Sequence, residues 1–306
     1  MYNIPVLFII FNRLETTKQV FAKIRDAKPM ILYIAADGPR VEKEGERTKC
    51  DIIRQYVLNA IDWECEVKTL FSEINQGCKW AIIKAINWFF ETEDFGIILE
   101  DDCIPHLDFF RFCMELNLLY KNDNDIFAIS GTNINVKEDI EYDYFFSIFG
   151  GNWGWATWKR AWVYFTDNIK PMMIAKNWKI IKHNINNNRA YYTIKKNLKS
   201  KEAKIQMDTS AWDYQWLFIR SLMNKKTIVP KYNLVSNIGF GSDSSHTFDE
   251  NHPLGNLPIH ELEATLKHPG DTNVLKTYDK QFSFYVVAPF FKRVILRLKM
   301  IIGIKI

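Results

Sequence analysis

The stretch Phe95-Gly96-Ile97-Ile98-Leu99-Glu100-Asp101-Asp102 decides the fold, because a short apolar run ends abruptly in three consecutive acids. An apolar run of this length suits a strand that is buried on both faces of a parallel sheet. In open α/β sheets, ligands bind beyond the carboxyl ends of the strands. The three acids therefore stand where such a fold places its ligand site.

Apolar runs alternate with helical segments on both sides of this stretch. The alternation predicts an α/β fold of the Rossmann-like type, with a mostly parallel central sheet flanked by helices and joined by right-handed crossovers. Strands are predicted at 6–11, 31–36, 66–71, 95–99, 127–130 and 227–235, and helices at 14–27, 47–61, 77–91, 106–120 and 211–224.

The domain organisation follows from changes in composition along the chain. We predict a catalytic domain over residues 1–256, with a solvated helical insert rich in Lys and Asn at about 167–206. A C-terminal extension over 257–306 ends in a basic amphipathic tail, 284–306. Charge interrupts this tail too often for a membrane span. The tail suits either an anionic membrane surface or a helix docked on the body or on a second subunit.

Composition excludes several classes of protein. The 306 residues are 47% hydrophobic and 25% charged, the balance of a soluble globular enzyme. The net charge is +4, but five of the basic residues lie beyond residue 285, and we recognise no continuous Lys/Arg block with interleaved aromatic residues, the pattern typical of a nucleic-acid binder, in residues 1–285. Five widely spaced cysteines predict free thiols. Since no signal peptide is visible, we expect a cytoplasmic protein, and the membrane-binding interpretation of the tail would place it on the inner face of the membrane.

The acid triplet has two interpretations. Adjacent carboxylates repel one another, and hard oxygen ligands suit Mg²⁺ or Mn²⁺ shared with a diphosphate. Alternatively, the acids form a turn that caps the following helix. Two further junctions add weight to the first interpretation, since Asn12-Arg13 and Asp37-Gly38 follow the first two strands. Arg13 can grip a phosphate bidentately, and Asp37 either accepts hydrogen bonds from a nucleotide or forms an ordinary turn.

The order of these motifs resembles the GT-A glycosyltransferases of the N-acetylglucosaminyltransferase I type, over about residues 4–250. The motifs that carry the resemblance are Asn12-Arg13, Asp37-Gly38, Asn75-Gln76-Gly77, Glu100-Asp101-Asp102, Gly154-Trp155, Trp212-Asp213, Gly239-Phe240-Gly241 and Ser245-His246.

The resemblance implies roles for the donor-binding residues. Asp102 would bind the metal, Asp101 would face the ribose and Glu100 the sugar. Arg13 and Asp37 would contact the nucleotide.

The same resemblance implies roles for residues later in the chain. Asp213 would be the catalytic base, although Tyr214 stands where the family has a second acid, and the alternative is that Asp213 caps the helix that follows. His246 would donate to the diphosphate from a closing loop. Trp155 and Trp212 would contact the acceptor or the sugar.

The resemblance as a whole implies a hexosyl- or N-acetylhexosaminyltransferase that uses Mn²⁺ or Mg²⁺. It would move a sugar from a nucleotide-diphosphate donor to a hydroxyl of a glycan or lipid-linked acceptor, with inversion, in surface polysaccharide synthesis. One alternative is a nucleotidyltransferase, which the glycine-free first junction Phe11-Asn12-Arg13-Leu14 counts against. Another is a non-catalytic module that binds a glycan or nucleotide sugar, which the intact acids count against.

Overall fold

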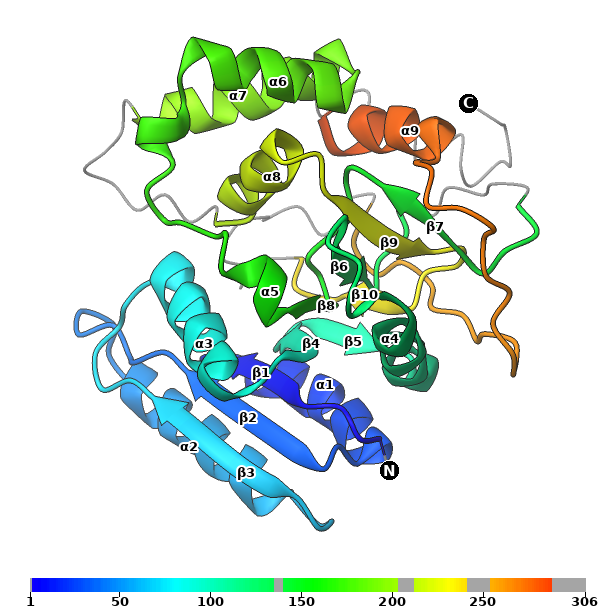
Figure 1. Ribbon diagram of the computed structural model, residues 1–306. Coiled ribbons are helices and arrows are strands. Elements are labelled where there is room, and N and C mark those ends of the chain that lie inside the picture. Colours follow the sequence, from blue (N-terminus) through cyan, green and yellow to red (C-terminus); the bar gives the residue numbers. More distant parts are fainter. Residues whose placement is uncertain (1, 135–139, 203–211, 241–253, 288–306) are drawn as a thin grey trace.

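The computed structural model describes residues 2–134, 140–202, 212–240 and 254–287. A mixed eight-stranded sheet forms its centre, in the order β3-β2-β1-β4-β8-β6-β9-β7, and a two-stranded sheet pairs β10 with β5 (Figure 1). The strands of the large sheet are β1 (Val6–Ile10), β2 (Ile31–Ala36), β3 (Glu66–Phe71), β4 (Phe95–Glu100), β6 (Ile126–Ser130), β7 (Tyr144–Ser147), β8 (Trp155–Trp158) and β9 (Lys226–Pro230), and those of the small sheet are β5 (Cys103–Pro105) and β10 (Val235–Asn237).

Helices cover both faces of the large sheet. They are α1 (Leu14–Ala27), α2 (Glu46–Asn59), α3 (Cys78–Thr92), α4 (Leu107–Tyr120), α5 (Lys159–Trp162), α6 (Ala175–Ile185), α7 (Asn188–Glu202), α8 (Trp212–Leu222) and α9 (Lys276–Val287), with a 3₁₀ turn at Lys170–Met172.

The alternation of side chains along β1 shows how the core is divided. Val6, Phe8 and Ile10 pack into the cluster that contains buried residues of α1, α2 and α4. Leu7 and Ile9 point to the other face, into the cluster built with α3 and α8. Since successive side chains of a strand point to opposite faces, a continuous apolar run is what a doubly covered strand requires. The predicted α/β class, with a mainly parallel sheet flanked by helices, is confirmed.

The strand order reverses next to β1. The chain moves from β1 to β2 and then to β3 on one side, and returns to place β4 on the other side of β1, with all four strands parallel. Such a reversal leaves a crevice at the carboxyl ends of the two strands on either side of it. The residues that follow β1 and β4 therefore lie at the crevice of the sheet.

Two predicted segments differ in detail from the structure. The strand predicted at 227–235 is divided, because β9 ends at Pro230 and β10 pairs in the opposite direction with β5 in a separate sheet. The predicted insert contains two helices, α6 and α7, joined by a two-residue connection.

The described part of the C-terminal extension packs on the sheet. Val274 forms a β-bridge with Phe146, and the centroid of the buried Tyr278 ring lies 4.7 Å from that of the Phe145 ring.

All five cysteines are free thiols, as predicted from their spacing. Among the helices of the described ranges, none combines the length and the apolar character that crossing a membrane requires. The tail predicted to bind a membrane begins inside α9, and its residues 288–306 lie outside the described residues.

Candidate functional site

Arg13 and the acid triplet meet at the crevice between β1 and β4. Arg13 is the residue before α1, Glu100 ends β4, and Asp101 and Asp102 form the turn that follows. Nη2 of Arg13 lies 2.9 Å from Oδ2 of Asp102 and also donates to Oδ1 of Asp101. The side chains of Arg13, Asp101 and Asp102 are 20%, 5% and 14% exposed. The structure thus brings together four of the predicted site residues at the place that the topology indicates.

Burial dominates the protonation of these acids. The pKa of Asp101 is raised by burial, against the lowering effect of the neighbouring Arg13 charge. The pKa of Glu100 is raised first by burial and then by the charges of Asp102 and Asp101. Among the described residues, Oδ2 of Asp101 is buried without a hydrogen-bond partner. The raised pKa values mean that ionising all three acids beside the single charge of Arg13 is unfavourable, and an additional cation or donor would favour their ionised forms.

The segment after β10 packs directly on Asp102. The N–H of Ile238 donates to the carbonyl oxygen of Asp102 at 2.8 Å, and the N–H of Gly239 donates to Oδ1 of Asn237 at 2.8 Å. A Cβ at position 239 would lie 2.0 Å from Oδ2 of Asp102, so a side chain there would displace the carboxylate. Gly239 therefore forms part of the wall of the acid cluster.

His246 follows this segment and lies in 241–253, outside the described residues. Its predicted contact with a diphosphate stays a prediction.

Asp37 holds the loop before α3. Its Oδ1 accepts from the N–H groups of Gly38 and Gln76, both at 2.8 Å. Its Oδ2 accepts from Nδ2 of Asn75 at 2.9 Å and from the N–H of Gly77 at 3.1 Å. A carboxylate has about four acceptor positions, so these bonds fill it. In the structure the carboxylate of Asp37 positions residues 75–77, and its predicted contact with a base or ribose stays a prediction.

Glu46 joins the first two strand junctions, and the sequence did not reveal it. Its Oε1 accepts from Nδ2 of Asn12 at 2.8 Å, and its Oε2 accepts from the N–H of Arg40 at 2.7 Å. The hydrogen bonds from the Arg40 side chain lower the pKa of Glu46 to about 2. An acid in the first turn of a predicted helix is ordinarily explained by the helix dipole. No feature of the sequence distinguished Glu46 from that case.

Asp213 lies exposed in the first turn of α8. Its Oδ1 accepts from the N–H of Tyr214 at 2.9 Å, as in an acid that stabilises the start of a helix. After burial and the two adjacent aspartates, the charge of Asp213 also raises the pKa of Glu100. The two carboxylates therefore share one electrostatic environment, although they are far apart in the sequence.

Trp155 and Trp212 belong to the core below the site. Their exposed fractions are 1% and 5%, and their rings stack on each other with centroids 5.7 Å apart. Trp155 also packs against Trp162 and Trp216. Both rings pack in the core of the structure, and their predicted contact with a sugar or acceptor stays a prediction. Because Trp155 pairs with Ile98 of β4, this stack fixes the start of α8 relative to the strand that carries the acids.

The carboxylate oxygens of the crevice suit a hard divalent cation. Asp102 is partly exposed, and the unpartnered Oδ2 of Asp101 lies beside it in the chain. Mg²⁺ is usually held by one or two carboxylates, with water and substrate phosphates completing the shell. Across the ranges that the structure describes, no cluster of three or more His, Cys, Asp or Glu side chains is arranged to hold a metal. An ion bound to Asp102 would therefore depend on a phosphate ligand for its remaining contacts.

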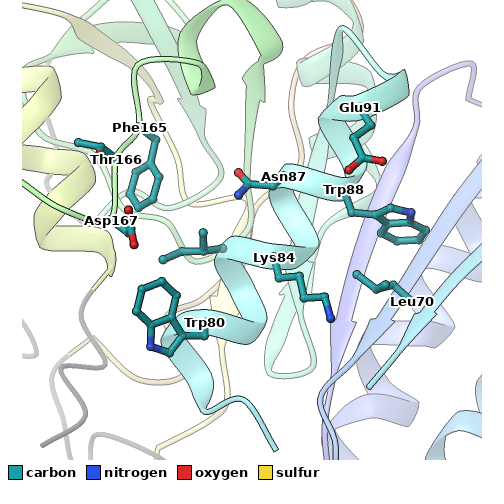
Figure 2. A pocket seen from close by; sticks show the side chains of 10 residues that line it. Leu70, Trp80, Lys84, Asn87, Trp88, Glu91, Phe165, Thr166 and Asp167 are labelled. Atoms are coloured by element: carbon teal, nitrogen blue, oxygen red, sulfur yellow. The ribbon is translucent and has the colours of Figure 1, made fainter. Parts of the chain in front are cut away.

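A groove of about 530 Å³ runs along the outer face of α3 (Figure 2). One wall consists of α3 side chains, with the exposed ring of Trp80 near the start of the helix, and the opposite wall is the segment 165–167. Both walls are tied to elements of the site. The N–H of Gly77, just before α3, binds Asp37, and Nε2 of Gln215 in α8 donates to the carbonyl oxygen of Asp167 at 2.7 Å.

The lining of this groove combines rings with polar groups. It contains Leu70, Trp80, Ile83, Lys84, Asn87, Trp88, Glu91, Phe165, Thr166 and Asp167. Aromatic faces with amide and carboxylate groups beside them are suited to the mixed apolar and hydroxyl surface of a sugar.

Comparison with protein-family models and with curated proteins finds no match. Solved structures match over about half of this chain. One is the mannosyltransferase PcManGT from Pyrobaculum calidifontis in complex with GDP-Man and Mn²⁺, at 14% identity and a TM-score of 0.33, covering 51% of this chain and 45% of that chain. The match therefore spans less than half of the mannosyltransferase.

HddC from Yersinia pseudotuberculosis also matches, at 12% identity and a TM-score of 0.31, covering 52% of this chain and 78% of that chain. Its complex with GMP-PN gives 14% identity and a TM-score of 0.32 over the same shares. These likenesses are distant and partial, so the functional argument rests on the site itself.

Proposed function

We propose that this chain is a metal-dependent glycosyltransferase. It would transfer a hexosyl or N-acetylhexosaminyl group from a nucleotide-diphosphate donor to a hydroxyl of a glycan or lipid-linked acceptor, in surface polysaccharide synthesis. The observation that carries the proposal is the meeting of Arg13 with Glu100, Asp101 and Asp102 at the crevice where the strand order reverses.

The donor would bind with its diphosphate at this crevice. Asp102 would hold Mn²⁺ or Mg²⁺, and the ion would supply positive charge to the leaving diphosphate. Arg13 already lies beside these carboxylates, so its guanidinium is within reach of a phosphate bound there. Gly239 permits the close approach of the chain to Asp102 and so shapes the wall that the diphosphate would contact.

Asp213 would act as the base that deprotonates the acceptor hydroxyl. A base must come within hydrogen-bond reach of the proton that it removes. The position of Asp213 at the exposed start of α8, where its charge contributes to the raised pKa of Glu100, supports this role. Direct displacement by the activated hydroxyl would invert the configuration at the anomeric carbon, as the resemblance implies.

The groove along α3 gives the acceptor a place to bind. Its Trp80 end lies beside the loop that Asp37 holds, and its opposite wall is hydrogen-bonded to α8, two residues after Asp213. We expect Trp80→Ala to raise the KM for the acceptor. Donor hydrolysis in the absence of acceptor should not change, because Trp80 would not contact the donor.

The test is a screen of UDP-, GDP-, CMP- and dTDP-sugars by thermal shift and donor hydrolysis, with and without Mn²⁺. The wild type is compared with Asp102→Asn and Asp213→Asn. Stabilisation by one donor that needs the metal and is lost in Asp102→Asn would support the proposal, since ligands that bind the folded state raise its stability. Release of pyrophosphate from a nucleoside triphosphate would instead identify a nucleotidyltransferase. Binding of a sugar without turnover would identify a binding module.

A further inference from the structure

Positive charge is concentrated in residues 168–201, which comprise the segment before α6 and the α6–α7 hairpin up to Lys201; the last residue of α7, Glu202, is acidic. Residues 168–201 contain nine basic residues and no acid. The whole chain has 40 Lys and Arg against 36 Asp and Glu, so the remainder has 31 against 36, a net charge of −5. The basic residues are Lys170, Lys176, Lys179, Lys182, Arg189, Lys195, Lys196, Lys199 and Lys201. A charge asymmetry of this size points to a partner of opposite charge.

The hairpin presents one face to the body and one to the outside. Trp178, Ile181 and Ile185 of α6 are buried, as are the inward side chains of α7, and Trp178 packs edge-on against Phe218 of α8 at 5.3 Å between centroids. The hairpin forms the outermost layer above α8 (Figure 1). Exposed lysines lie on the opposite face at Lys176, Lys179, Lys182 and Lys196.

Large apolar side chains are exposed among these lysines. Ile174 is 52% exposed, Ile180 is 37% exposed and Tyr192 is 59% exposed. Nζ of Lys182 lies 5.9 Å from the ring centroid of Tyr192, which shows that the two helices contribute to one surface. Single exposed apolar side chains also occur elsewhere on the described surface, as at Val41 and Leu118, but those of the hairpin lie among several exposed lysines.

We propose that the outer face of the α6–α7 hairpin binds an anionic membrane surface. Lysines attract anionic lipid headgroups, and apolar or aromatic side chains between them enter the interfacial region. A soluble polyanion would be recognised by the lysines alone, so the exposed Ile174, Ile180 and Tyr192 favour the membrane. The inference goes beyond the proposed transferase function and does not depend on it, because it concerns a face on the side of α8 away from the sheet.

The experiment is co-sedimentation of the full-length protein with vesicles of phosphatidylcholine alone or mixed with phosphatidylglycerol. Binding should need the anionic lipid, and it should weaken strongly when salt is raised from ~0.1 M to ~0.5 M, because the Debye length shortens. Lys176, Lys179 and Lys196 are changed together to Glu. This variant should bind anionic vesicles at least about tenfold more weakly than the wild type.

A matched control changes Lys43, Lys49 and Lys121 together to Glu, three exposed lysines outside the hairpin. This control variant changes the net charge by the same amount as the hairpin variant, and it should keep most of the binding to anionic vesicles. Tyr192→Ser keeps the charge and should weaken binding to a smaller degree, with little dependence on salt. This second variant also tests the proposal if the triple substitution disturbs the hairpin.

Equal loss of binding in both triple variants would show that net charge alone matters and would overturn the proposal. Unchanged binding of the hairpin variant would also overturn the proposal, because the basic residues after 285 would then be the ones that bind the vesicles. Binding of the wild type to dextran sulfate but not to anionic vesicles would identify a soluble polyanion as the partner and would equally overturn it.

Discussion

Nη2 of Arg13 lies 2.9 Å from Oδ2 of Asp102, so a residue that follows the first strand compensates the charge of an acid that follows the fourth. The same nitrogen also donates to Asp101. Arg13 therefore acts as the resident counter-charge of the acid cluster. The arrangement makes the cluster sensitive both to the loss of this arginine and to the addition of a cation.

Arg13→Gln should lower the free energy of unfolding by about 3 kcal/mol, because removal of one partner leaves buried carboxylates uncompensated. Added Mn²⁺ or Mg²⁺ should restore part of this loss, and should stabilise the variant more than the wild type. Chemical denaturation with and without the metal measures both effects. Arg47→Gln is the control, since it breaks an exposed ion pair with Glu73 that is worth at most about 1 kcal/mol. Equal responses of Arg13→Gln and the wild type to metal would contradict a cation site at these acids.

Gly239→Ala should impair donor binding. The added Cβ would lie 2.0 Å from Oδ2 of Asp102, so the carboxylate or the chain must shift. We expect the metal-dependent thermal shift with the donor to fall, and donor hydrolysis to fall at least about tenfold, since small misplacements at a site are costly. Gly270→Ala is the matched control, because a Cβ there meets nothing within 4 Å. Full activity of Gly239→Ala would show that Asp102 does not need its present position.

Asp213→Asn should separate turnover from binding. Loss of a general base typically costs between about 10² and 10⁴ in rate. Donor affinity in the thermal-shift assay should be retained, because Asp213 would not contact the diphosphate. The amide still accepts the hydrogen bond from the N–H of Tyr214, so α8 should keep its start. A variant that transfers sugar at the wild-type rate would show that Asp213 only stabilises the helix.

The sequence predicted the crevice well because strand ends impose proximity. The carboxyl ends of parallel strands share one edge of a sheet, so Arg13 and the acid triplet were expected at the same edge, and the pairing of β1 with β4 brings Arg13 and Asp102 together. The same reasoning did not reveal the hydrogen bonds of Asp37 to residues 75–77. Whether its carboxylate is open or filled depends on how residues 75–77 fold back, and no pattern in the sequence determines that.

Burial was the second property that the sequence did not reveal. Trp155 and Trp212 lie in motifs near the site, but an aromatic residue beside a functional residue packs into the core as readily as it faces a ligand. Glu46 was not predicted as a site residue because an acid in the first turn of a helix is ordinarily explained by the helix dipole. The basic hairpin was visible as a solvated insert, and only its packing on α8 showed which lysines face outward.

Asp279 provides a test of pH dependence away from the site. Burial raises its pKa to about 7, above the ordinary value of 3.8, although the hydroxyl of Ser147 and the N–H of Ile148 donate to it. The folded state therefore keeps a proton that the unfolded state releases. The stabilising contribution of this proton is fully present below pH 3.8 and is lost as pH rises to about 7.

Asp279→Asn should remove this loss, because an amide does not titrate. Relative to the wild type, we expect the variant to gain about 2.6 kcal/mol of unfolding free energy between pH 5 and pH 8, since the loss runs from pH 5 to the folded-state pKa at about 1.4 kcal/mol for each pH unit. Urea unfolding of both proteins at the two pH values measures this difference. The buried acids of the crevice contribute equally to the pH dependence of both proteins, so their contribution cancels when the two are compared. Glu261→Gln, at an exposed carboxylate, should leave the pH profile unchanged. Parallel profiles for Asp279→Asn and the wild type would mean that Asp279 is ionised in the folded protein throughout this range.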